Sequence, residues 1–187
     1  SVTFKPDYQR LGLQGLTADM LSLFQRRVYD IAGITPKDVK VKMNQQSLKV
    51  NDFKHYVQLY LNEEDKKHTL YEVGGERWSI AISLHHEYKQ VSFVNGICTT
   101  KGGKHVDYVV NQITKKMVQY ILQKKKVTVK PAIIKEQLFV FVNCVIENPS
   151  FDSQTKDYLN TSVTKFGSTY EVSASFIDKL AKMGIMN

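Results

Sequence analysis

Apolar side chains recur at helical spacing in two long stretches of the chain. After Thr17, a favourable helix N-cap, apolar residues follow at intervals of three and four, and we expect Gly33 to end this helix. A longer helix is predicted from Lys104 to Gln123 on the same pattern. The predicted apolar faces consist of Met20, Leu21, Phe24, Val28 and Ile31 in the first helix and Val106, Val109, Val110, Ile113, Met117, Tyr120 and Ile121 in the second.

Three shorter helices are indicated by residues that favour a helix start. Asp52 opens a short amphipathic segment, Pro131 suits the first turn of a helix, and Ser173 can cap a last helix. The remaining apolar runs have strand length and are bounded by turn-forming residues. We predict strands at 2–5, a hairpin turning near Asn44 and Gln45, an antiparallel meander at 69–73, 77–84 and 89–97, and further strands at 138–146 and 168–172. The predicted fold class is therefore α+β, with a mixed sheet.

Composition limits the class of protein. The 187 residues, of which 42% are hydrophobic and 24% charged, suffice for one domain, or for one domain and a piece of another. No apolar run approaches the roughly 18 to 20 residues that a membrane span requires. Cys98 and Cys144 lie in apolar segments without metal-ligand spacing, which favours reduced thiols in an intracellular protein. The opening residues lack the order of a signal peptide, and we expect the chain to be a piece of a longer protein.

The positive charge is concentrated in one part of the chain. The formal net charge is +8, and residues 108–135 contain seven lysines and no acidic residue. Such a concentration is typical of a surface that binds a polyanion. A solvated helix end, with lysines favourably placed near its C-terminus, explains the same pattern, so charge alone leaves both interpretations open.

The segment “TTKGGKHVDYV” at residues 99–109 is one candidate for chemistry. Gly102 and Gly103 directly precede a predicted helix, where exposed N–H groups attract anions. The spacing differs from that of a phosphate-binding loop, and a tight strand-to-helix turn is the favoured interpretation. His105 is expected to be a packed or capping residue, and His85 and His86 lack the neighbours of a metal site.

A second candidate is the segment “NPSFDSQTKDYLN” at residues 148–160. It follows the apolar run “LFVFVNCVIEN” and is rich in turn formers, so it is either a solvated connection or a loop that presents Lys156 to a ligand.

Three segments together resemble one known family. The chain contains “RRVYDIAG”, “FVNGICTTKGGKHVDYV” and “FVNCVIENPSFDSQTK”. It thereby resembles eukaryotic DNA topoisomerase II, a type IIA topoisomerase, over essentially all of its length, in the C-terminal part of the ATPase region. Bacterial gyrase B is a more distant relative.

The resemblance implies that the chain contains parts of two domains. Residues 1–51 would form the C-terminal edge of a GHKL ATP-binding domain, the type shared by gyrase, Hsp90, histidine kinases and MutL. Residues 52–187 would form the transducer domain, which has a ribosomal protein S5 domain 2-like fold with a left-handed β-α-β crossover. That handedness departs from the general preference.

The resemblance also implies the site residues. Gln154 and Lys156 match positions of the family's Gln-Thr-Lys loop that contact the γ-phosphate of ATP, and Lys156 is the one expected to act in catalysis. Lys124, Lys125 and Lys126 match a basic loop that contacts duplex DNA. The complete enzyme would be a nuclear homodimer that uses ATP and Mg²⁺, with no membrane association. Because the catalytic Glu, the Mg²⁺-holding Asn and the lid motifs of the superfamily are absent from this sequence, we expect the isolated chain to be inactive, monomeric and without a bound cofactor.

Two alternatives remain open at the level of sequence. The chain could be a freestanding nucleic-acid-binding module with an S5-like fold, or the transducer of another GHKL ATPase from mismatch repair or a type IIB topoisomerase. The second alternative is disfavoured, because those relatives have a functional lysine in this region without the surrounding “NPSFDSQTK” sequence.

Overall fold

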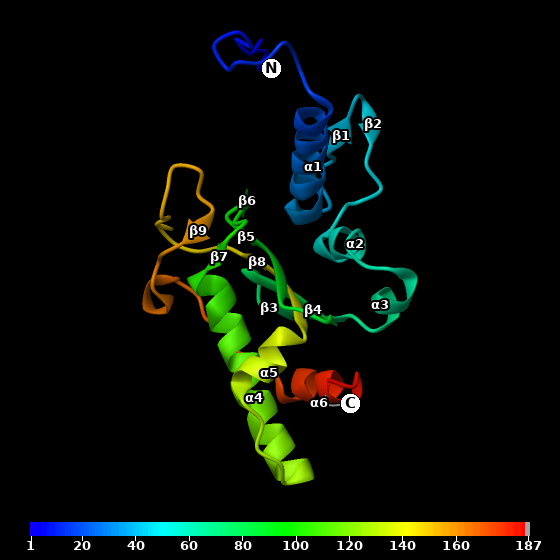
Figure 1. Cartoon of the computed structure of the whole chain (residues 1–187), viewed down its shortest axis with the longest axis vertical. Coiled ribbons are helices and arrows are strands. Elements are labelled where there is room, and N and C mark those ends of the chain that lie inside the picture. Colours follow the sequence, from blue (N-terminus) through cyan, green and yellow to red (C-terminus); the bar gives the residue numbers. More distant parts are fainter. Residues whose placement is uncertain (186–187) are drawn as a thin grey trace.

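A mixed β-sheet with helices on both faces forms the centre of the computed structural model (Figure 1), in which residues 1–185 are described. The strands are β1 (Lys42–Met43), β2 (Gln46–Ser47), β3 (Leu70–Gly74), β4 (Trp78–Leu84), β5 (Lys89–Val94), β6 (Ile97–Cys98), β7 (Gly102–Gly103), β8 (Leu138–Cys144) and β9 (Tyr158–Leu159). The helices are α1 (Ala18–Ile34), α2 (Phe53–Gln58), α3 (Glu63–Lys67), α4 (Lys104–Lys125), α5 (Pro131–Glu136), the 3-10 helix η1 (Val163–Lys165) and α6 (Ala174–Lys182). The predicted α+β class with a mixed sheet is confirmed.

The strand order differs from the predicted meander. In the part of the chain that the structure describes, the central sheet has five strands in the order β3-β4-β8-β5-β6. β3 and β4 are antiparallel neighbours as predicted, but β5 pairs with β8 in parallel, and β8 separates it from β4. The prediction of three consecutive antiparallel strands was therefore wrong for β5. The connection from β5 to β8 runs through α4 and α5, which makes it a β-α-β crossover.

β8 takes the centre of the sheet because both of its faces are apolar. Leu138, Val140 and Val142 face a core shared with α4, α5 and α6, while Phe139 and Phe141 face a second core shared with α1 and α2. Figure 1 shows these two groups of helices on opposite sides of the sheet. A strand that is buried on both faces reads as a continuous apolar run, as this one does.

The helix starts predicted from the sequence are confirmed. The side chains of Thr17, Asp52 and Ser173 each accept a hydrogen bond from a backbone N–H in the first turn of α1, α2 and α6. Pro131 stands at the start of α5, and α4 extends two residues beyond its predicted end at Gln123. Among the described residues, none of the helices combines the length and the apolar character needed to cross a membrane.

Gly33 does not end α1, which continues to Ile34. A Cβ at Gly33 would lie 2.4 Å from the Tyr56 Cβ, so this glycine permits the close approach of α1 to α2. Here the Tyr56 hydroxyl donates a 2.6 Å hydrogen bond to the buried Asp30 carboxylate. The apolar face of α1 stays partly uncovered, with Leu21 and Phe24 46% and 43% exposed.

Two predicted strands do not form. Residues 2–5 are irregular and have no partner strand within the described chain; Val2 is 93% exposed. Residues 168–172 are irregular although Tyr170 is buried against Trp78. The Tyr170 carbonyl accepts hydrogen bonds from the side chains of Tyr108 and Gln112, so side chains replace the strand partner that this segment would need.

Candidate functional site

Residues 150–160 form an ordered hairpin that projects from the sheet. The Asp152 N–H donates to the Tyr158 carbonyl over 3.1 Å, and the Asn160 N–H donates to the Ser150 carbonyl over 2.8 Å. At the tip, Lys156 adopts a left-handed conformation with φ of 60°, and its N–H donates to the Ser153 carbonyl. The polar segment is therefore more than an irregular connection.

The base of this hairpin is joined to the turn that precedes α4. β9 pairs in parallel with β7, and Leu159 is fully buried. The tight turn predicted at Gly102 and Gly103 is confirmed, since their φ angles are 75° and 141°. Sequence reasoning missed the pairing, because a two-residue parallel strand pair leaves no periodic pattern.

The two residues predicted to contact a phosphate lie exposed at the tip. Gln154 and Lys156 are on the surface, while the hydroxyl of Thr155 donates to Asp157 Oδ2 over 2.7 Å and so turns back toward the hairpin. Lys156 Nζ lies 5.9 Å from the centroid of the Phe151 ring. In the described chain, no side-chain hydrogen bond or ion pair involves Gln154 or Lys156. Within the described residues, the amide and ammonium groups are thus exposed and are not held by other side chains.

The lysine cluster Lys124, Lys125 and Lys126 lies at the opposite end of α4. All three side chains are exposed, and Lys126 caps the helix in a left-handed conformation with φ of 58°. Lys116, in contrast, is held by Glu171 and the Val172 carbonyl. α4 has 22 residues and is about 33 Å long, so the structure does not bring the hairpin tip and the lysine cluster together.

Behind the Gly102–Gly103 turn lies a buried polar network. The Ser92 and Thr99 hydroxyls are 2.6 Å apart, and Thr99 Oγ1 lies 3.2 Å from Nε2 of His105, which is fully buried. The His105 Nδ1 atom has no hydrogen-bond partner within the described residues. Burial lowers the pKa of the His105 imidazole from its ordinary value of 6.5 to about 3. His105 is thus a neutral, packed residue, as predicted.

His105 makes the fold sensitive to mild acid. Between pH 6.5 and 3 the unfolded chain binds a proton at this imidazole and the folded chain does not, so the stability present above pH 6.5 is lost as the pH falls. At pH 5 the loss attributable to His105 should be about 2 kcal/mol. Urea unfolding at pH 7.5 and pH 5 should show a smaller pH effect in a His105→Gln variant. Equal pH effects in both proteins would contradict the buried neutral state.

Both cysteines are free thiols. Cys98 and Cys144 are buried, and burial raises the pKa of each thiol above its ordinary value. This agrees with the reduced thiols predicted from the sequence.

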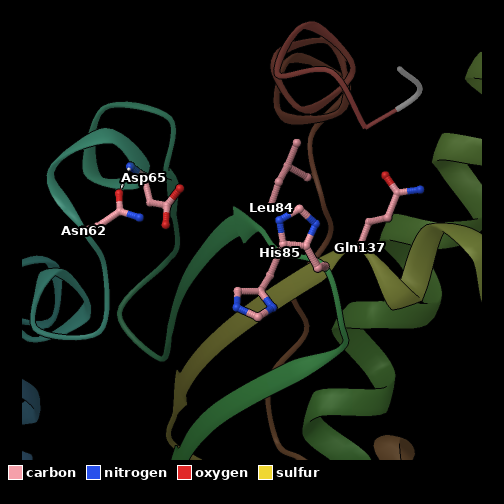
Figure 2. A pocket seen from close by; sticks show the side chains of 6 residues that line it. Asn62, Asp65, Leu84, His85 and Gln137 are labelled. Atoms are coloured by element: carbon pink, nitrogen blue, oxygen red, sulfur yellow. Dashed lines mark hydrogen bonds between the residues drawn. The ribbon is translucent and has the colours of Figure 1, made fainter.

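A separate hollow of about 600 Å³ lies near the end of β4. It is lined by Asn62, Asp65, Leu84, His85, His86 and Gln137, all of which except His86 are labelled in Figure 2. The His85 ring nitrogens face backbone atoms of Glu87 and the Lys89 ammonium. Over residues 1–185, no group of three or more His, Cys, Asp or Glu side chains is arranged to hold a metal ion. The hollow contains none of the predicted site residues.

The comparisons with known proteins agree with this architecture. A family model described as DNA gyrase B matches residues 43–185. The chain therefore belongs to the DNA gyrase B family. The chain is similar to DNA topoisomerase 2 of Candida glabrata, with 45% identity, covering 97% of this chain and 14% of that protein. The chain thus spans only a small part of the length of this relative.

Solved structures show the same similarity. The ATPase region of Saccharomyces cerevisiae topoisomerase II matches with a TM-score of 0.88 and 45% identity, covering 97% of this chain and 47% of that chain. The ATPase and transducer domains of DNA topoisomerase II from Balamuthia mandrillaris match with a TM-score of 0.87 and 36% identity, covering 95% of this chain and 45% of that chain.

Proposed function

We propose that this chain is the part of an ATP-dependent type II DNA topoisomerase that senses the γ-phosphate of ATP and relays nucleotide state to DNA strand passage. The observation that carries this proposal is the hairpin at residues 150–160. Gln154 and Lys156 are exposed at its tip, and in the described chain neither side chain makes a hydrogen bond or an ion pair. Similarity to topoisomerase II over 97% of the chain supports it and disfavours both a freestanding module and another ATPase of the superfamily.

The chemistry of the tip suits a terminal phosphate. A lysine ammonium is a compact positive charge, which stabilises the negative charge that shifts during phosphoryl transfer, and a glutamine amide can donate to a terminal oxygen. Contacts that exist only while the γ-phosphate is present give the bound and hydrolysed states different energies, so they can bias a domain rotation. Lys156 is the residue that we assign to catalysis.

We divide the chain near residue 51. Residues 1–51 would complete the edge of a GHKL ATP-binding domain, and residues 52–187 would form the transducer. The start of the family match at residue 43 and the irregular backbone just before α2 support a boundary in this region. The partly exposed apolar face of α1 suits contact with the rest of such a domain.

The complete enzyme is proposed to be a nuclear homodimer that acts on duplex DNA and uses ATP with Mg²⁺. Because the described residues contain no cluster that could hold a metal, we assign no step of the mechanism to Mg²⁺ within this chain. The complete protein should relax supercoiled plasmid with ATP and not with ADP, and the isolated chain should hydrolyse no ATP. A complete protein without ATP-dependent relaxation would refute the proposed function.

The lysine cluster is proposed to contact DNA phosphates without reading sequence, since lysines offer point charges and no bidentate base contacts. Replacing Lys124, Lys125 and Lys126 together with Ala should reduce the slope of log affinity against log salt concentration by about 0.9 for each lost phosphate contact, and hence by at most about 3. Binding of this chain to a fluorescent DNA duplex at several salt concentrations measures the slope.

A matched control removes the same charge elsewhere. Lys40, Lys42 and Lys49 are exposed and belong to the segment of the β1-β2 hairpin, which lies away from α4 (Figure 1). Replacing these three with Ala should leave the slope close to that of the wild type. If the two triple variants change the slope equally, the cluster is only a solvated helix end.

A further inference from the structure

Asp157, which directly follows the Gln-Thr-Lys sequence, holds the hairpin from two sides. Its Oδ1 accepts a 2.9 Å hydrogen bond from the Thr100 hydroxyl, and its Oδ2 accepts a 2.7 Å hydrogen bond from the Thr155 hydroxyl. Thr155 lies between the two residues assigned to the phosphate, whereas Thr100 belongs to the turn that leads into α4. One carboxylate therefore connects the tip of the hairpin to a segment that lies 57 positions away in the sequence.

The backbone strengthens the same connection. The Lys101 N–H donates to the Asp157 carbonyl over 2.9 Å, and the pairing of β7 with β9 follows immediately in both segments. The Lys101 Nζ atom lies 4.0 Å from Asp157 Oδ2. Thr100 is itself positioned, because its carbonyl accepts a 2.9 Å hydrogen bond from the Gln90 amide on β5. The carboxylate is thus bound to a turn that the central sheet holds in place.

The electrostatics agree with an ionised carboxylate. The hydrogen bond from Thr155, followed by that from Thr100, lowers the pKa of Asp157 below its ordinary value of 3.8. Hydrogen bonds to an ionised acceptor are shorter and stronger than those between neutral groups. The contact is therefore present throughout the neutral pH range in which an ATPase works.

We propose that Asp157 and Thr100 form a latch that positions Lys156 and Gln154 for the γ-phosphate by fixing the hairpin on the turn before α4. This inference rests on the proposed function for its catalytic consequence. Asp157 is a positioning residue, because it acts through the residues beside it. The hairpin tip projects into solvent and has few buried contacts of its own, so without the latch it would sample many orientations.

The latch is tested first in this chain by hydrogen exchange. The Lys156 amide, bonded to the Ser153 carbonyl, should exchange about tenfold faster in Thr100→Val and in Asp157→Ala than in the wild type. Adding Thr100→Val to Asp157→Ala should change the exchange rate little further, since Asp157→Ala has already removed the contact between these two residues. The midpoint of urea unfolding should stay nearly constant, because Thr100 is exposed and Asp157 is only half-buried. Thr164→Val is the matched control: its exposed hydroxyl contacts Ser162 and not the hairpin.

The second readout is ATP turnover by the complete enzyme. Thr100→Val and Asp157→Ala should each lower kcat by about tenfold and change KM for ATP by less than about twofold, because misplacing Lys156 weakens the transition state more than the bound substrate. Asp157→Asn keeps an acceptor for Thr100 and should fall between Asp157→Ala and the wild type.

The outcomes separate this inference from the proposed function. Unchanged exchange at Lys156 in both latch variants would overturn the latch, whatever the turnover. Faster exchange with normal kcat, in an enzyme that Lys156→Ala does slow, would overturn its positioning role. Normal turnover in Lys156→Ala would instead refute the proposed function, and the exchange rates would still decide whether the latch exists.

Discussion

A Gly103→Ala substitution should destabilise the chain by about 3 kcal/mol or more, since it combines backbone strain with a collision in a packed region. The φ angle of Gly103 is 141°, and a Cβ there would lie 2.4 Å from the backbone nitrogen of Leu159. The methyl group can be accommodated only if β9 moves away from β7, and this movement would release the base of the hairpin. Urea unfolding followed by the fluorescence of Trp78, the only tryptophan, measures the loss.

The control for this prediction is Gly75→Ala. Gly75 also has a positive φ, 64°, but a Cβ there would meet no atom within 4 Å. Only the backbone penalty remains, and the expected loss is about 1 kcal/mol. A Gly103→Ala variant no less stable than Gly75→Ala would show that the close pairing of β7 with β9 is not present in solution.

The second large effect concerns catalysis by the complete enzyme. Lys156→Ala should slow ATP hydrolysis by roughly 10², as expected when a donor that stabilises transition-state charge is removed. ATP-dependent relaxation of supercoiled DNA should fall at least as far, because the hairpin would lose its contact with the γ-phosphate. In the isolated chain the same change should shift the free energy of unfolding by no more than about 0.5 kcal/mol, since Lys156 is exposed.

Lys165→Ala provides the comparison for this effect. Lys165 is also exposed and lies in η1, at the surface and outside the hairpin. Its replacement removes the same charge and should leave both activities unchanged. Wild-type rates in Lys156→Ala would mean that the Gln-Thr-Lys sequence is only a turn.

Local features of the fold were predictable from the sequence because local chemistry determines them. Thr17, Asp52 and Ser173 cap helices through their own side chains, and Asn44 and Gln45 form the turn between β1 and β2 with positive φ angles. Such contacts span only a few residues, so a short stretch of sequence contains all the information that they require.

The order of the strands was not predictable in the same way. Whether β5 pairs with β4 or with β8 depends on which strand can be buried on both faces, and the turn of His85, His86 and Glu87 is compatible with either choice. The conformation of residues 168–172 also depends on distant residues and was not predictable from the local sequence. The sequence around Tyr170 is typical of a strand. Its carbonyl, however, accepts hydrogen bonds from the side chains of Tyr108 and Gln112 on α4 and does not pair with another strand of the described chain.

At the candidate site, two residues were identified from the sequence and two others were missed. Resemblance to a family identified Gln154 and Lys156, and the structure presents both at an exposed tip. Asp157 and Thr100 were missed, since their contact depends on the pairing of two very short strands. An acidic residue directly after Gln-Thr-Lys and a Thr-Thr pair before the glycines were the available signals, and neither is specific without the fold.

The most direct test of the central claim is amine-selective labelling of Lys156 in the complete ATPase region. A non-hydrolysable ATP analogue should slow modification of Lys156 by about tenfold or more, since a γ-phosphate contact removes its ammonium from solvent, whereas ADP should leave the rate unchanged. Lys165 should react equally in both states. Equal labelling of Lys156 with the analogue and with ADP would contradict the claim that this hairpin senses the γ-phosphate.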